Sequence, residues 1–166
     1  DQISWIITLN VLATAIATPL TGSLVSLFGR RFVLIFCSAS FTLATLACGM
    51  CDSLESLIFF RVLQGAVGAP LVPLSQATLL QSYPRDMHAR VNAIYGMSVV
   101  VGPALAPSLG GYLSELYDWR WVFFMMVPLG FLATIGNLKY VKDDGKQAGS
   151  KFDYLGFTLF SIAIIC

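Results

Sequence analysis

Long apolar stretches separated by short polar joins run along the whole chain. The stretches lie near residues 5–25, 32–50, 57–80, 91–113, 121–138 and 154–166. A helix of about 20 predominantly apolar residues crosses the hydrocarbon core of a bilayer. Short joins place consecutive helices side by side and antiparallel. The pattern therefore predicts an all-α membrane protein in which these segments form part of a single transmembrane bundle.

The composition strengthens this prediction. Hydrophobic residues make up 57% of the chain and charged residues 11%, whereas a soluble domain carries about 25% charged residues. A large soluble helical core is the alternative, and five or six consecutive, nearly uncharged runs of this length argue against it. The sequence has no basic face for nucleic acid and no P-loop, catalytic triad or metal-ligand pattern. We therefore expect no enzyme activity, no cofactor and no metal, with an ion gradient as the energy source.

The joins differ in charge between the two sides of the bundle. Alternate joins hold eight of the ten basic residues, which are Arg30, Arg31, Arg85, Arg90, Lys139, Lys142, Lys146 and Lys151. Cytoplasmic loops carry an excess of lysine and arginine, so these joins are expected inside and Asp1 outside, in the cytoplasmic (inner) membrane of a bacterium. Trp5, Trp119 and Trp121 then fall at the outer interface, where tryptophan is enriched.

The two ends of the sequence suggest that it continues beyond what is printed. The chain opens with Asp1 rather than Met, just before a span that runs inward, and it closes inside an apolar run. We therefore expect an earlier first helix and a second half outside this sequence.

Arg61 is the one ionisable residue deep within an apolar stretch. A guanidinium stays charged under essentially all conditions, and a charge in the middle of a membrane is costly unless it faces a wet cavity or a partner. Gln64, Gly65 and Gly68 share its helix face. Arg61 and Gln64 are therefore candidate transport and proton-coupling residues. The alternative is that Arg61 pairs with backbone carbonyls and only packs helices together.

A polar stripe marks the first apolar segment. Asn10, Thr14, Thr18 and Thr21 fall within a narrow arc at helical spacing. Such side chains either hydrogen-bond a neighbouring helix or line a cavity. For the threonines we favour the bond to a neighbour. For Asn10 both alternatives stay open, and we keep it as a third candidate transport residue.

The stretch GMSVVVGPALAPSLGG in the fourth segment has a small, interrupted surface. Pro103 and Pro107 each remove a helical donor, and Gly102, Gly110 and Gly111 let a partner helix approach closely. The pattern is typical of a bend or a tight seam, although an ordinary kinked membrane helix has the same composition.

Cys48 and Cys51 form a C-x-x-C pattern at the end of the second segment. A redox motif of this kind needs a helix N-terminus in a thioredoxin-like setting, which a membrane helix end does not provide. A strained external disulfide is slightly favoured over a redox function.

Four stretches, in order along the chain, resemble the motifs of one transporter family. GSLVSLFGRR resembles the loop motif G-x-L-x-D-x-x-G-R-R/K of the major facilitator superfamily, with Ser26 at the acidic position. LIFFRVLQGAVGAP looks like its fourth-helix motif. GMSVVVGPALAPSLGG is similar to the fifth-helix motif G-x-x-x-G-P-x-x-G-G of drug antiporters, with the glycine pair displaced. WRWVFFMMVPLG resembles the start of the sixth helix in fourteen-span drug:proton antiporters of the EmrB/QacA type.

The resemblance implies a fold and residue roles. The chain would supply helices two to six, and the start of helix seven, of the N-terminal bundle of a major facilitator fold. Arg61 looks like the family's proton-coupling or cavity arginine, and the fifth-helix motif looks like a bend that seals the cavity against leak. The loop motif, with Gly22, Ser26, Gly29, Arg30 and Arg31, resembles a cytoplasmic latch that favours the outward-facing state. Ser26 cannot supply the family's ion pair, so the latch is weaker or uses Asp86 or another acid.

The function implied is proton-coupled export of drugs or other amphipathic or cationic small molecules by alternating access. A carrier for a specific metabolite is one alternative, and a non-transporting scaffold or sensor of the same fold is another. Small-molecule substrate, lipid bilayer and protons are the expected partners, with a periplasmic adaptor and an outer-membrane channel beyond them. No Asp, Glu or His falls within the predicted spans, so the proton carrier is expected elsewhere, as an acid on the first helix that faces Arg61 or in the second half.

Overall fold

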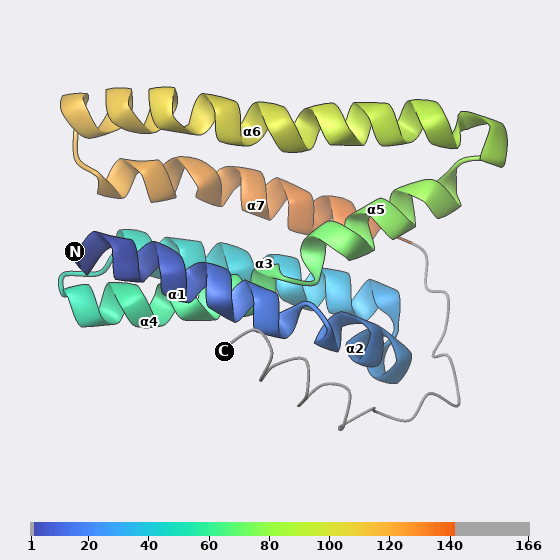
Figure 1. The fold of residues 1–166 in the computed structure, drawn as a ribbon, viewed down its shortest axis with the longest axis horizontal. Helices are drawn as coiled ribbons and strands as arrows, with labels where there is room; N and C mark the ends of the chain where they lie inside the picture. The colour runs from blue at the N-terminus through green and yellow to red at the C-terminus, as the bar shows by residue number, and fades with distance from the viewer. Residues whose placement is uncertain (1, 142–166) are drawn as a thin grey trace.

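The computed structural model describes residues 2–141, with side chains described from residue 8 onward. In order along the chain its helices are α1 (Gln2–Ala17), α2 (Leu20–Phe28), α3 (Arg30–Gly49), α4 (Leu54–Gly68), α5 (Leu71–Ser82), the short 3-10 helix η1 (Arg85–Met87), α6 (His88–Leu116) and α7 (Arg120–Tyr140). These residues contain no strand. The all-α class predicted from the sequence is confirmed (Figure 1).

The helices cover the first five predicted segments, and the sixth, 154–166, lies outside the described residues. Four helical stretches within residues 8–141 are long and apolar enough to cross a membrane, and α1 with α2 makes a fifth if the bent pair counts as one span. The stretch Leu54–Ser82, which includes both α4 and α5, counts as one of the four.

Proline interrupts two of the predicted segments. The segment predicted near 5–25 is in fact two helices, α1 and α2, bent by 52° at Thr18 and Pro19. Pro19 has no N–H to donate to the preceding turn, so α1 ends at Ala17. Pro70 separates α4 from α5 in the same way, as the sequence suggested. Pro73 lies in the first turn of α5, where no donor is needed.

Helix α3 is the centre of the bundle. It packs against α4 on one side and α7 on the other, and α1 lies along α4 (Figure 1). Small residues permit the close α3–α7 approach. A Cβ atom on Gly49 would lie 3.0 Å from the Phe124 ring, and one on Gly130 would overlap Thr42. Helix α6 lies at the edge of the bundle, beside α7 and α5, and of its residues only Val91 is buried.

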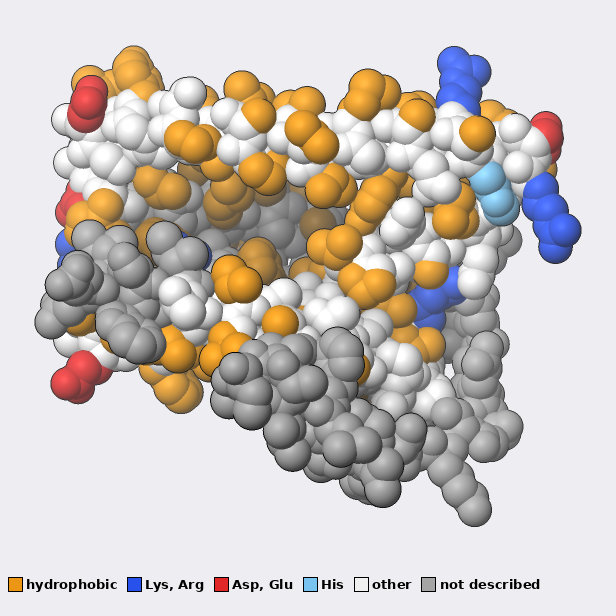
Figure 2. All heavy atoms as spheres, viewed as in Figure 1, with side chains coloured by type: hydrophobic (Ala, Val, Ile, Leu, Met, Phe, Trp, Pro, Cys, Tyr) orange, Lys and Arg blue, Asp and Glu red, His pale blue; other side chains and the backbone are white. Residues whose placement is uncertain are grey.

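The two ends of the bundle differ in their residues. The tryptophan end holds the connections 50–53 and 117–119, and the basic end holds Gly29 with Arg30 and the segment 83–90. Charged side chains gather at these two ends, while apolar side chains cover the length between them (Figure 2). Many large apolar side chains are exposed along the helices, among them Phe59, Val100 and Leu132. Such a surface suits a lipid environment rather than water.

Candidate functional site

A cavity of about 400 Å³ lies where four helices meet. Its lining comes from α1, α3, α4 and α7 and consists of Asn10, Thr14, Phe41, Thr45, Arg61, Gln64, Gly65, Gly68, Val122, Phe123 and Met126. The three residues predicted to serve transport, Asn10, Arg61 and Gln64, are thus brought to one place. The predicted face of Arg61, Gln64, Gly65 and Gly68 is the α4 side of this cavity.

Arg61 is half-buried and its partners are neutral. Its Nη1 donates a hydrogen bond to Gln64 Oε1 over 3.1 Å, and its guanidinium carbon lies 4.6 Å from the centre of the Phe123 ring. Its Nε is buried and bonds to no acceptor among residues 8–141. Within the same residues no carboxylate forms an ion pair with it. The cavity therefore contains a positive charge that no part of the described chain neutralises.

Gln64 connects Arg61 to α3. Its Nε2 donates to Thr45 Oγ1 over 2.7 Å, and the Thr45 hydroxyl donates to the carbonyl oxygen of Phe41 over 2.7 Å. Gln64 and Thr45 are both buried, at 6% and 2% exposure. Thr45 and Phe123 were not among the site residues predicted from the sequence. A signal for Thr45 exists, because it shares one face of α3 with the polar residues Ser38 and Thr42.

Asn10 and Thr14 bind α1 to the backbone of α4. Asn10 Nδ2 donates to the Arg61 carbonyl over 2.6 Å, and Thr14 Oγ1 donates to the Gly65 carbonyl over 3.1 Å. A Cβ atom on Gly65 would lie 2.5 Å from the carbonyl oxygen of Asn10, so only glycine fits this crossing. Asn10 therefore makes an interhelical bond and also lines the cavity. Thr18 bonds within its own helix to the Thr14 carbonyl.

The loop motif ties the start of α3 to other helices at the basic end. Gly29 has a φ of 85°, a left-handed conformation that favours glycine, and it joins α2 to α3. The Arg30 guanidinium hydrogen-bonds Gln81 on α5, and Arg31 Nη2 donates to the Leu138 carbonyl on α7 over 3.0 Å.

No acid takes part in this connection within residues 8–141. Ser26 bonds back to the Ser23 carbonyl over 2.8 Å, and Asp86 is exposed and pairs with neither arginine. A Cβ atom on Gly22 would meet nothing within 4 Å. The latch role of this motif stays a prediction.

The glycine–proline motif lies on α6, away from the Arg61 cavity. The helix is continuous through Pro103 and Pro107. A Cβ atom on Gly102 or Gly111 would meet nothing within 4 Å, and one on Gly110 would lie 4.0 Å from Val122 Cγ2. None of these residues lines the cavity, so their role as a bend stays a prediction.

The disulfide between Cys48 and Cys51 is absent. Both thiols are free and buried, and Cys51 Sγ donates to the Ala47 carbonyl over 3.1 Å. Burial raises the pKa of the Cys51 thiol, with the neighbouring Asp52 carboxylate adding to the rise and Arg120 opposing it. The thiol is therefore neutral at pH 7 and a poor nucleophile. The disulfide that the sequence favoured only slightly over a redox function does not form, because α3 continues through Gly49 and Cys51 bonds back along the same helix axis. No group of three His, Cys, Asp or Glu suited to a metal ion occurs in the described part of the chain.

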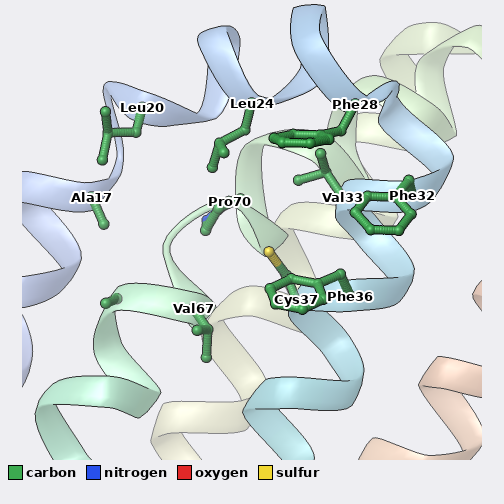
Figure 3. A pocket seen from close by; sticks show the side chains of 11 residues that line it. Ala17, Leu20, Leu24, Phe28, Phe32, Val33, Phe36, Cys37, Val67 and Pro70 are labelled. Atoms are coloured by element: carbon green, nitrogen blue, oxygen red, sulfur yellow. The ribbon is translucent and has the colours of Figure 1, made fainter. Parts of the chain in front are cut away.

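A second cavity of about 460 Å³ lies on the inner side of the α1–α2 bend and has different chemistry. Phe28, Phe32 and Phe36 form one wall, and Leu20, Leu24 and Pro70 line the space facing them (Figure 3). Every labelled side chain in it is apolar apart from the thiol of Cys37. This cavity offers no charge to bind an ion or a proton, so the Arg61 cavity is the candidate functional site.

Comparison with known proteins agrees with this architecture. The sequence model of the Major Facilitator Superfamily matches residues 1–160. The chain is 39% identical over 165 residues to the multidrug export protein EmrB of Escherichia coli strain K12. The aligned residues make up 99% of the chain and 32% of EmrB. It is 37% identical over 164 residues to the fatty acid resistance protein FarB of Neisseria gonorrhoeae, covering 98% of the chain and 32% of FarB.

A third relative is the probable multidrug resistance protein EmrY of Escherichia coli strain K12, 34% identical over 165 residues that make up 99% of the chain and 32% of EmrY. The chain thus spans about a third of the length of these relatives.

Proposed function

Because the chain belongs to the Major Facilitator Superfamily, we propose that it forms cavity-lining helices of a secondary active transporter that exports amphipathic drugs in exchange for protons. The observation that carries this proposal is the un-neutralised charge of Arg61 at a cavity lined by four helices. An intramembrane arginine marks a substrate or ion pathway far more often than a structural contact. The name of the relative EmrB, a multidrug export protein, supports the same direction of transport.

The cavity chemistry favours one class of drug. Phe41, Phe123 and Met126 offer an apolar wall, and the guanidinium beside them attracts an anionic or strongly polar head. An amphipathic acid fits both features. The guanidinium would repel a cationic drug, and the described lining of the cavity offers no carboxylate to offset this repulsion. The name of the relative FarB, a fatty acid resistance protein, is consistent with an amphipathic acid.

Proton coupling in this proposal needs a partner for Arg61. The guanidinium does not lose its proton, but it favours the ionised form of any acid placed against it. For exchange, an acid from outside residues 8–141 would release its proton as the substrate binds and would take up a proton as the substrate leaves. The two bundles would rock around this midplane site. The protein would lie in the cytoplasmic membrane, with an adaptor and an outer-membrane channel continuing the path.

Transport by the intact protein tests this proposal. Energised membrane vesicles are supplied with decanoate or with a decyl-trimethylammonium ion, which share an alkyl chain and differ in the charge of the head. We expect gradient-dependent transport of decanoate, lost when the proton gradient is collapsed and in Arg61→Ala. Arg90→Ala is the matched control, because Arg90 is exposed and pairs with no carboxylate among the described residues.

Three outcomes would contradict parts of the proposal. Transport of the ammonium ion alone would replace the substrate class with cations. Equal transport by Arg61→Ala at equal membrane content would remove the arginine from the mechanism. The absence of any transport from well-inserted protein would favour a carrier for one metabolite or a non-transporting scaffold.

A further inference from the structure

We propose that Thr45 is a positioning residue for Arg61. Its hydroxyl fixes the direction of the Gln64 amide, and that amide holds the guanidinium over the Phe123 ring. The inference rests on the proposed function, in which the Arg61 charge meets the substrate or the proton carrier. Thr45 belongs to α3 and does not contact the Arg61 guanidinium through any hydrogen bond of the described structure.

The chemistry of the two partners determines the direction of each hydrogen bond. The Phe41 carbonyl can only accept, so the Thr45 hydroxyl must donate its one proton to it. Thr45 Oγ1 can then only accept from Gln64, which requires the Gln64 NH₂ group to face α3. The amide oxygen is left on the opposite side, where it accepts from Arg61 Nη1. The backbone of α3 thereby determines which atom Gln64 presents to the charge.

Two groups hold the guanidinium of Arg61 in place. Arg61 has a long flexible side chain, and within residues 8–141 its head is held by the Gln64 oxygen and by the Phe123 ring. A reversed Gln64 amide would present N–H groups to the N–H groups of Arg61, which repel. Because Gln64 is buried, no bulk water is available to restore the correct orientation. Loss of the Thr45 hydroxyl should therefore release Arg61 from its position.

The positioning role of Thr45 differs from ordinary helix packing. Threonines in membrane helices often bond the carbonyl one turn earlier without any further role, as Thr134 does with Gly130 on α7. Thr45 differs because its oxygen also accepts from another helix, and the donor is the residue that binds the cavity charge. Thr134→Val is thus a control in which the same chemical group is lost without a connection to Gln64.

The experiment uses the intact protein in the vesicle assay with decanoate. Thr45→Val keeps the shape and removes the hydroxyl, and we expect it to raise KM by roughly threefold to tenfold. The pH dependence of KM should shift as well. Thr45→Ser restores the hydroxyl and should recover wild-type KM, and Thr134→Val should leave KM unchanged. A purely structural role would lower the amount of folded protein while KM and its pH dependence stayed constant, and that result would overturn the proposal.

Double variants supply a readout that needs no transport. Thr45→Val and Gln64→Leu break the same connection, so the unfolding midpoint of the purified double variant should fall no further than that of the more affected single variant. Additive falls would overturn the hydrogen-bond connection. If the wild type transports nothing, the proposed function fails, while the midpoint comparison still decides whether Thr45 acts through Gln64.

Discussion

At the scale of single residues, Arg61 is held by groups that stabilise a cation without neutralising it. A carboxylate partner would cancel the charge, whereas the Gln64 carbonyl and the Phe123 ring contribute a hydrogen bond and a cation–π contact. The guanidinium keeps unused donor capacity at Nε. Such a residue is poised to accept an anion, because binding replaces no existing ion pair within the described residues.

Gly65 permits the contact between α1 and α4 at this cavity. In Gly65→Ala the new methyl would lie 2.5 Å from the carbonyl oxygen of Asn10, which is backbone and cannot rotate away. We expect a loss of about 1–3 kcal/mol of stability, typical of overpacking, seen as a lower unfolding midpoint of the purified protein. Gly136→Ala is the control, because its methyl meets nothing within 4 Å. Equal midpoints for the two variants would show that α1 does not cross α4 this closely.

The site was predictable from the sequence only in part. Arg61 and Gln64 were found because a charge and an amide at helical spacing stand out in an apolar stretch. Asn10 was found as part of a polar stripe. Thr45 and Phe123 were not, because their place in the cavity depends on how α3 and α7 dock against α4, and helical periodicity does not specify which faces meet.

At the scale of helices, composition predicted where the apolar segments lie but not how each one bends. Pro70 and Pro73 were expected to disturb the apolar segment that carries Arg61. The break occurs at Pro70, while Pro73 is accommodated in the first turn of α5. Pro19 was overlooked inside an apolar run, although it divides α1 from α2. The bend aligns Leu20 and Leu24 with the apolar cavity instead of extending the stripe of Asn10 and Thr14 (Figure 3).

Arg120 connects separate helices at the tryptophan end. Its Nη2 donates to the Cys51 carbonyl and to Asp52 Oδ1, each over 3.0 Å, and its Nη1 donates to Asp118 Oδ2 over 3.2 Å. These contacts join the α3–α4 connection to the start of α7. The Asp52 side chain is 94% exposed, so its ion pair is screened by water and contributes little. The hydrogen bond from Arg120 to the Cys51 carbonyl is less exposed to screening and contributes more to stability than the ion pair.

We expect Arg120→Gln to lower stability modestly, by about 1 kcal/mol, since it loses the charged hydrogen bond to the Cys51 carbonyl and two exposed ion pairs. The unfolding midpoint of the purified protein measures this change, at low and at high salt. The difference from wild type should shrink only slightly in high salt, because the carbonyl bond is less screened than the ion pairs. Arg90→Gln should leave the midpoint unchanged, and an equal drop there would attribute the effect to net charge instead.

At the scale of the whole molecule, the charged side chains of the described residues, apart from Arg61, are sorted between the two ends. The basic end holds Arg30, Arg31, Arg85, Arg90 and Lys139 against one acid, Asp86. The tryptophan end holds Asp52, Glu55, Glu115 and Asp118 against one base, Arg120. Between the ends the exposed surface is largely apolar (Figure 2). The alternation of basic and acidic joins along the chain thus becomes, after folding, a difference in charge between the two ends of the bundle.

The positive-inside rule then predicts the orientation of the bundle. Glu55→Cys and Asp86→Cys place thiols at opposite ends, at exposed acidic positions without an ion pair in the described residues. The native Cys37, Cys48 and Cys51 are buried and should contribute little background once Cys166 is replaced by serine. A membrane-impermeant maleimide should label Glu55→Cys in intact cells and label Asp86→Cys only after the membrane is opened. The reverse pattern would place the basic end outside, and the proposed direction of transport would have to be reversed with it.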